Sequence, residues 1–331
     1  MMLPNKIFSL LLQFFTLFTI TFASTEEATA LLKWKSTFKN QNNSLLASWQ
    51  PSFDACNDWY GVICFNGRIN RLNISNSRVT GTLYDFPFSS LHFLEYFELS
   101  MNNLSGTIPP EIGNLTNLIY LDLSINQISG TILPQIGSLA RLQTLHIFDN
   151  HLNGSIPEEI GYLRSLTELS LSTNSLNGSI SASLGNLNNL TLLNLYENNI
   201  SGPIPSELGN LINLNDLALS NNQLNGPIPF SIDNLRNLHT LFLDDNNLTP
   251  EGIPSFICNL TSLTLLHLSR NNLKGKILQC LGNIVGLQYV MMSHNNFSGE
   301  LPSSICNLTS LQILDLGRNN LIGAIPQFLA T

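Results

Sequence analysis

The 331-residue sequence has few charged residues and no cluster of basic ones. Asp, Glu, Lys and Arg make up 11% of the chain, against roughly 25% in ordinary soluble domains. The formal net charge is -8. A surface that binds phosphate groups needs clustered Lys and Arg, so the sequence argues against a nucleic-acid partner.

The sequence also lacks the motifs of common catalytic and metal-binding sites. It contains no glycine-rich phosphate loop, no H-E-x-x-H, no G-x-S-x-G and no protein-kinase signature, and its six histidines are scattered without metal-ligand spacing. His146, Asp149 and Ser170 could be assembled into a triad, but serine is the usual residue at such positions, so we interpret the set as a coincidence. We expect no enzyme activity, no cofactor and no metal.

The one long apolar run lies at the N-terminus. It extends from Ile7 to Phe22, follows the lone cation Lys6 and is followed by Ala23 and Ser24, which is the layout of a signal peptide over residues 1–23. The alternative is a membrane anchor, but a span needs about 20 apolar residues. We therefore predict a secreted chain with no membrane span, folded in an oxidising compartment.

Leucine, asparagine, glycine and serine are abundant and recur with a fixed period. Glycines follow one another at intervals of 24 residues, as at Gly106, Gly130 and Gly154, with an interval of 25 at two places. Eleven units of the form L-x-x-L-x-L-x-x-N-x-L-x-G run from residue 69 to 323, the pattern of a leucine-rich repeat. The period of two in x-L-x-L-x places both leucines on one face of a short strand. Stacked units would bury these leucines and align the strands into a parallel concave sheet, giving an α/β solenoid.

An asparagine ends each predicted strand from Asn102 to Asn319. Its amide can both donate to and accept from backbone groups where the chain turns inward, so we predict a structural ladder of asparagines.

Most units continue after the glycine with x-I-P-x-x-(I/L)-G-N-L, as in GTIPPEIGNL (106–115), whereas Leu133, Ser181 and Leu278 replace the proline in three units. The preceding STEEATALLKWKSTF reads as a helix with a capping box from Ser24 to Glu27. These phrases, with ICNLTSL and LGRNNL, resemble plant extracellular leucine-rich repeat receptors, namely Cf-type receptor-like proteins and related receptor-like kinases. The resemblance implies a right-handed superhelix of about 11 repeats over residues 69–326, a second strand added by the GxIP, and a helical N-terminal cap over residues 24–68.

The five cysteines fall into two groups. Cys56 and Cys64 are close in sequence and have no further Cys or His nearby to complete a metal site, so we predict a disulfide between them. Cys258 and Cys306 occupy the same repeat position two repeats apart, roughly 10 Å at strand spacing, which is too far for a bridge. We expect both of them, and Cys280, to be buried free thiols.

Twelve N-x-S/T sequons are present, a density that fits a secreted surface. Asn73 lies within a predicted concave strand. The others, predicted to be glycosylated and to leave the concave wall bare, are Asn42, Asn103, Asn114, Asn153, Asn177, Asn189, Asn199, Asn247, Asn259, Asn296 and Asn307.

The third, fifth, seventh and eighth places of each repeat project from the predicted concave wall. Serine fills many of them, but aromatic and charged residues gather in the fourth to tenth repeats, and such residues are typical of binding hot spots. We predict an extended peptide or protein ligand there, held by exposed aromatic rings, an acidic stripe and a more basic C-terminal end. The candidate ligand-binding residues are His146, Phe148, Asp149, Tyr196, Glu197, Phe242, Asp244, Asp245, His267, Arg270 and His294.

The resemblance implies a non-catalytic receptor ectodomain at the outer face of the plasma membrane, which captures its ligand for defence or developmental signalling and pairs with a co-receptor kinase. Residues 327–331 stop inside a repeat without a cysteine-containing cap, so we expect a partial ectodomain. The alternative is a short secreted protein, either a soluble decoy or an inhibitor similar to plant polygalacturonase-inhibiting proteins. The missing C-terminal cysteine pair counts against the inhibitor.

Overall fold

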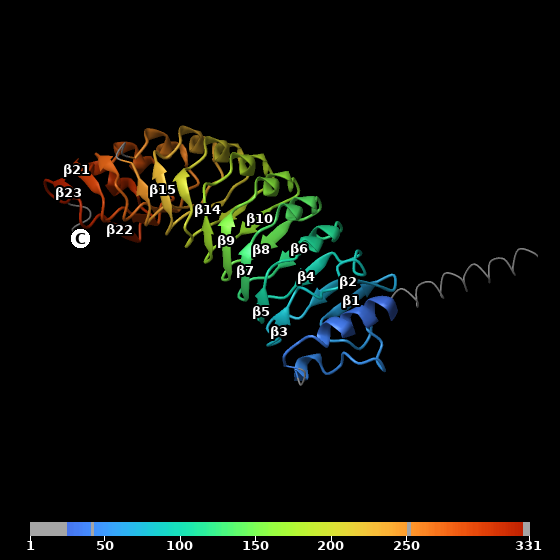
Figure 1. Cartoon of the computed structure of the whole chain (residues 1–331). Helices are drawn as coiled ribbons and strands as arrows, with labels where there is room; N and C mark the ends of the chain where they lie inside the picture. The colour runs from blue at the N-terminus through green and yellow to red at the C-terminus, as the bar shows by residue number, and fades with distance from the viewer. Residues whose placement is uncertain (1–24, 41–42, 250–252, 327–331) are drawn as a thin grey trace, which may run out of the picture.

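The computed structural model describes residues 25–40, 43–249 and 253–326. They form one curved stack in which each repeat lies against the next (Figure 1). The predicted signal peptide and residues 327–331 lie outside the described residues.

The concave wall is one sheet of twelve strands. β1 (Val62–Phe65) belongs to the cap and runs antiparallel to β2 (Arg68–Asn73). From β2 onward every strand is parallel to the next, one per repeat and without a register shift, as predicted. The ten that follow β2 are β4 (Tyr96–Glu98), β6 (Tyr120–Asp122), β8 (Thr144–His146), β10 (Glu168–Ser170), β12 (Leu192–Asn194), β14 (Asp216–Ala218), β16 (Thr240–Phe242), β18 (Leu265–His267), β20 (Tyr289–Met291) and β22 (Ile313–Asp315).

The repeat leucines form the continuous core behind this sheet. Leu121, Leu145, Leu169 and Leu193 are fully buried on successive strands, directly opposite one another in the register. Each fully buried leucine stabilises the fold by roughly 1.5–3 kcal/mol. The same alternation turns the residues between the leucines outward, which gives the concave face its side chains.

A second set of short strands lies at the repeat glycines, most of which fall inside a strand or at its end. Gly106 illustrates this place, with a φ of +80° that favours glycine. The strands form one group of five, β3 (Thr80–Thr82), β5 (Asn103–Gly106), β7 (Gln127–Thr131), β9 (His151–Ser155) and β11 (Ser175–Asn177), and two of three, β13 (Ser201–Pro203), β15 (Gln223–Gly226) and β17 (Asn247–Leu248), then β19 (Lys274–Gly275), β21 (Asn296–Glu300) and β23 (Asn320–Ile322). The first break follows the repeat with Ser181, but the repeat with Leu133 keeps a full strand, so replacing the proline does not by itself end this sheet.

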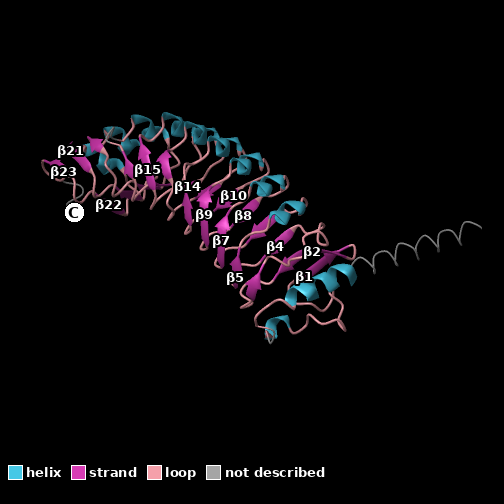
Figure 2. Ribbon diagram, in the orientation of Figure 1, coloured by secondary structure: helices cyan, strands magenta, loops and turns pink. Residues whose placement is uncertain are grey.

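Short 3-10 helices follow the outer curve of the arc (Figure 2). In most repeats the helix follows an extended proline, such as Pro109 at φ -69° and ψ 147°. They are η2 (Pro110–Asn114), η3 (Pro134–Ser138), η4 (Glu158–Tyr162), η5 (Ala182–Asn186), η6 (Ser206–Asn210), η7 (Phe230–Asn234), η8 (Ser255–Asn259), η9 (Gln279–Asn283) and η10 (Ser303–Asn307).

The N-terminal cap covers the first repeat. Its helix spans residues 25–35 and is followed by η1 (Ser44–Leu46). Trp34 is fully buried and meets the rings of Phe38 and Phe86 edge-on, at centroid distances of 4.7 and 4.9 Å. These rings exclude water from the end of the leucine core.

The predicted capping box from Ser24 to Glu27 stays a prediction. Ser24 lies outside the described residues, and Glu27 is buried with both carboxylate oxygens in use. Arg68 Nε donates to Oε1 at 2.7 Å, and the Ile69 backbone N–H donates to Oε2 at 2.8 Å. Glu27 therefore joins the cap helix to the first parallel strand.

The cysteine predictions are half right. Cys56 and Cys64 form the expected disulfide. Cys258 and Cys280 were predicted to be free thiols, but they form a second disulfide with Cα atoms 5.6 Å apart. Cys306 is a free thiol, as predicted, but it is half-buried and not buried. The physical reason is the offset between repeats, because a Cβ placed on Gly209 would lie 2.4 Å from Cβ of Ser231, 22 residues later. Cys258 stands at the position of that glycine, and Cys280 follows it by 22 residues.

The predicted asparagine ladder is confirmed. Asn126 is buried, and its Nδ2 donates to the carbonyls of Leu99, Leu123 and Ser124 at 3.0–3.2 Å. Its Oδ1 accepts the backbone N–H of Leu104 at 3.0 Å. One side chain thus satisfies backbone groups of two neighbouring repeats.

Within the part of the chain that the structure describes, no helix has the length and apolar character needed to cross a membrane.

Candidate functional site

The concave face carries the side chains of the third, fifth, seventh and eighth repeat places. The eighth place adopts a left-handed backbone in repeat after repeat, with φ near +50° at Asp149, Glu197, Asp245, Arg270 and His294. Because the backbone is the same in each repeat, these five predicted residues share one row along the wall. Only the identity of the side chain differs between repeats.

A hollow of about 380 Å³ lies on the concave face over β12 to β18. It is lined by Asn194, Tyr196, Ala218, Ser220, Phe242, Asp244 and His267. We call it the concave hollow. Four of the predicted ligand-binding residues, Tyr196, Phe242, Asp244 and His267, thus come together from three of four consecutive repeats.

The two aromatic rings of the hollow are reachable from solvent. Tyr196 is 37% exposed, and Phe242 is half-buried with its ring 6.2 Å from the His267 ring in an edge-on arrangement. Both side chains point away from the leucine core, because they occupy the outward places of their repeats. An apolar group of a ligand would find two ring faces here.

Asp244 differs from the prediction. It is only 7% exposed, so it does not belong to a solvent-facing acidic stripe. The His267 ring donates to Asp244 Oδ1 at 3.0 Å, and the Ser220 hydroxyl donates to the same oxygen. Burial alone would raise the pKa of Asp244, but these hydrogen bonds and the nearby His267 outweigh burial and hold the pKa below its usual value of 3.8. A carboxylate therefore forms the polar floor of the hollow.

The remaining charged residues lie beside the hollow in the eighth-place row. Asp245 pairs with Arg270 at 3.7 Å, and Glu197 accepts the hydroxyl of Thr173 at 3.1 Å. His294 Nδ1 is buried and has no hydrogen-bond partner among the described residues. The predicted change from acidic to basic side chains toward the C-terminal end is therefore present in this row.

His146 and Phe148 lie nearer the N-terminal end, about three strands from the centre of the hollow in the strand order. Phe148 is half-buried, and its ring lies 6.0 Å from that of His146. His146 Nε2 faces Glu168 at 3.2 Å, and no bond to Asp149 or Ser170 is present among the described residues, so the triad is not assembled. The described residues hold no group of three or more His, Cys, Asp or Glu placed to bind a metal ion.

The sequence interpretation missed the first parallel strands of the wall. Arg71, Tyr96, Glu98, Tyr120 and Asp122 all project from the concave face of β2, β4 and β6. The signal was the repeated Tyr-x-Glu and Tyr-x-Asp at third and fifth places, which depart from serine as clearly as the later residues do.

The described sequons, except Asn73, have exposed asparagines and lie off the concave strands. Asn42 lies outside the described residues. Asn73 is half-buried on β2, where its Nδ2 donates to Glu98 Oε2 at 2.8 Å. Glycosylation at the other sites stays a prediction.

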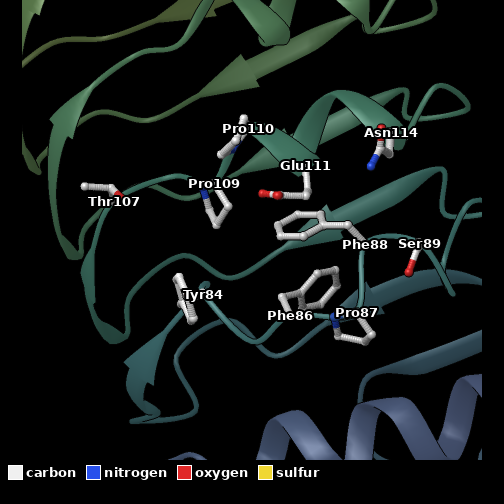
Figure 3. A pocket seen from close by; sticks show the side chains of 10 residues that line it. All are labelled: Tyr84, Phe86, Pro87, Phe88, Ser89, Thr107, Pro109, Pro110, Glu111 and Asn114. Atoms are coloured by element: carbon white, nitrogen blue, oxygen red, sulfur yellow. The ribbon is translucent and has the colours of Figure 1, made fainter.

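A second hollow, of about 450 Å³, lies off the concave face, between η2 and the turn before β4 (Figure 3). Its walls include Phe86, Phe88 and Pro110, with Glu111 and Asn114 at the η2 side. Asn114 is also a predicted glycosylation site. The concave hollow, in contrast, has no sequon asparagine among its lining residues.

Matches to known protein families cover nearly the whole described chain. Residues 24–65 match the leucine rich repeat N-terminal domain, and residues 72–203 match a leucine-rich repeat region. Five further leucine rich repeat matches cover 213–235, 237–260, 262–284, 286–308 and 310–331. Among curated proteins, MDIS1-interacting receptor like kinase 2 of Arabidopsis thaliana is 54% identical over 99 residues, which is 29% of this chain and 10% of that protein.

Two solved receptor ectodomains have the same fold. The structure of PEPR1 with AtPEP1 is 33% identical with a TM-score of 0.83, over 92% of this chain and 46% of that one. The Arabidopsis receptor kinase HAESA, in complex with the peptide hormone IDA and the co-receptor SERK1, is 31% identical with a TM-score of 0.77, over 91% of this chain and 55% of that one. The chain therefore spans about half the length of these ectodomains.

Proposed function

Because the chain belongs to the leucine-rich repeat family, in the form found in plant receptor ectodomains, we propose that it is a non-catalytic recognition domain that binds a peptide on its concave face. The concave hollow carries the proposal. It joins two accessible rings, Tyr196 and Phe242, to a buried polar group, Asp244 with His267. Rings beside a fixed polar group are the usual composition of a binding hot spot.

An extended peptide fits this wall better than a small molecule does. The hollow lies beside the eighth-place row, because Tyr196 and Asp244 are directly followed by Glu197 and Asp245, and Arg270 continues the row. A peptide lying across the strands would reach the hollow and this row together. Side chains of the ligand would then be selected separately at each position.

The proposal includes an extracellular location and a co-receptor kinase. Two disulfides are stable in an oxidising compartment, and the exposed sequons suit a secreted surface. The co-receptor rests on the HAESA complex, in which a peptide ligand and SERK1 are both present. Signalling in defence or development follows from the same resemblance.

The test is capture of secreted peptides from plant tissue and microbial cultures on the full chain, followed by mass spectrometry. We expect the double variant Tyr196→Ala with Phe242→Ala to lose captured peptides at least about tenfold, because hot-spot truncations commonly cost 2 kcal/mol or more. Its thermal midpoint should stay close to that of the wild type, because both rings lie outside the core.

The matched control is Tyr289→Ala, a concave tyrosine on β20 outside the hollow, whose hydroxyl donates to Gln312. This variant should retain the captured peptides. Capture that survives loss of Tyr196 and Phe242 contradicts the proposed site. Capture of a polygalacturonase in place of a peptide would favour the inhibitor interpretation.

A further inference from the structure

Four rings form an oblique line across β4, β6 and β8 at the N-terminal part of the concave face. Tyr96 and Tyr120 stack at 6.5 Å, Tyr120 meets His146 edge-on at 6.1 Å, and His146 meets Phe148 edge-on at 6.0 Å. We call these four residues the aromatic strip. It is separate from the concave hollow, which begins at β12.

The first ring of the strip already binds a cation of the chain itself. The Arg71 guanidinium lies 5.4 Å from the centre of the Tyr96 ring, and Arg71 Nη2 pairs with Glu98 Oε1 at 2.6 Å. A tyrosine at the third place and a carboxylate at the fifth place of β4 thus hold a guanidinium between them. Such a site combines a cation–π contact with an ion pair.

The same pair of side chains recurs one strand along. Tyr120 and Asp122 on β6 stand directly opposite Tyr96 and Glu98 in the parallel register. Asp122 Oδ1 accepts the backbone N–H and the hydroxyl of Ser124, at 2.9 and 2.6 Å. Among the described residues Asp122 takes part in no ion pair. This second pair therefore differs from the first in having no arginine or lysine paired with it, and its neighbour on β8 is His146, which stands opposite Asp122 in the register.

The charges around Tyr120 are mainly negative. Burial raises the pKa of the Tyr120 phenol, and Asp122, Glu98 and Glu168 raise it further, while Arg71 lowers it. Three carboxylates are therefore close enough to the ring to act on its hydroxyl, and one arginine partly offsets them. A cation placed beside Tyr120 would be favoured by the ring and by the surrounding carboxylates.

We propose that Tyr120 and Asp122, with the rest of the aromatic strip, form a second subsite that takes an arginine or lysine side chain of the peptide ligand. This inference rests on the proposed function and adds the chemistry of one ligand residue. The molecule's own Arg71 shows the geometry on the neighbouring strand. The complementary charge identifies the occupant as basic.

The spacing of the two subsites defines the ligand further. From β6 to β14, the strand that lies between the repeats of Tyr196 and Phe242, there are four strand steps, about 19 Å at about 4.8 Å per step. An extended peptide advances about 3.3 Å per residue, so about five or six residues separate its basic side chain from the apolar one in the hollow.

A random dodecapeptide library displayed on phage, panned on the full chain, tests the inference. Peptides selected on the wild type should contain Arg or Lys at least about fivefold above the library frequency, five or six positions from an aromatic or aliphatic residue. Tyr120→Leu with Asp122→Asn should return the basic residues to the library frequency. For a selected peptide, replacing its Arg with neutral citrulline should weaken binding to the wild type about tenfold and leave binding to this variant unchanged.

The control is Tyr289→Leu with Asp315→Asn, the same changes in the same rows on β20 and β22, which should keep the basic preference. A second comparison, Tyr196→Ala with Phe242→Ala, should lose the apolar preference and keep the basic one. Selected peptides that depend on the hollow but lack basic residues, or a basic preference that survives loss of Tyr120 and Asp122, overturn this inference alone. If panning on the wild type enriches no peptide at all, the proposed function is overturned as well.

Discussion

Asp244 shows how one substitution converts a framework position into a binding position. Most repeats have serine at this seventh place, where it adds little to the wall. In this repeat a carboxylate takes hydrogen bonds from Ser220 on one side and His267 on the other. Three repeats are thereby tied together at the floor of the concave hollow.

Replacing this residue should give a pH-dependent loss of stability. The folded state holds the pKa of Asp244 below its usual 3.8, so the ionised form stabilises the fold at neutral pH. We expect Asp244→Asn to lower the free energy of unfolding by about 1 kcal/mol at pH 7. The difference from wild type should vanish as the pH falls through the folded pKa, because both side chains are then uncharged.

Urea unfolding of both proteins from pH 7 to pH 3 measures this difference. Other carboxylates titrate over the same range, but they do so in both proteins and cancel in the comparison. A gap that stays constant down to pH 3 would mean that the charge of Asp244 does not contribute.

The sequence predicted which residues of the candidate site lie on the concave face, but it did not predict the contacts between them. The period of two placed Tyr196, Phe242 and His267 on the concave face, where the structure has them. It could not show that Asp244 is buried, since burial depends on His267 in the next repeat and Ser220 in the previous one. Tyr96 and Tyr120 were not predicted, because their pairing appears only when the strands of two repeats are placed in register.

At the scale of the single repeat, the asparagine ladder stabilises the turn that follows each concave strand. Asn150 is buried, and its Nδ2 donates to the carbonyls of Leu123, Ile147 and Phe148, while its Oδ1 accepts the N–H of Ile128. We expect Asn150→Ala to cost about 2–4 kcal/mol, because it leaves several buried backbone groups without partners. Chemical denaturation measures the loss.

Asn188 provides the comparison for this change. It is exposed and lies outside the ladder, and Asn188→Ala should change the free energy of unfolding by less than about 0.5 kcal/mol. Equal effects of the two substitutions would show that the ladder adds nothing beyond an ordinary surface asparagine.

The elements themselves were largely readable from the sequence. One parallel strand per repeat, the buried leucines and the ladder follow from a strict local period. The sequence did not predict where the second sheets are interrupted. The loss of a proline at Leu133 leaves its strand intact, because backbone pairing with both neighbouring repeats persists there.

At the scale of the whole molecule, the Cys258–Cys280 disulfide joins two repeats where the second sheets are interrupted, between β17 and β19. At the other junctions, except the one between β11 and β13, neighbouring repeats are joined by strand pairing in two sheets. We expect Cys258→Ser with Cys280→Ser to lower stability by about 2–4 kcal/mol, the range typical of disulfides. Hydrogen exchange should rise mainly in η8 and η9, because each repeat contacts only its neighbours.

Cys306→Ser is the appropriate control, since Cys306 is a free thiol. It should leave both the stability and the exchange pattern as in the wild type. A uniform rise in exchange along the chain after loss of Cys258 and Cys280 would contradict a local clamp.

The left-handed eighth place of each repeat has a practical consequence for protein engineering. The backbone at this place is the same whether it carries Ile125, Asp149, Thr173 or Arg270. The coil therefore tolerates acidic, basic and aliphatic side chains there without a change of path. A row of eleven interchangeable positions could be rewritten to suit a chosen target, while the leucines and asparagines that fold the molecule stay untouched.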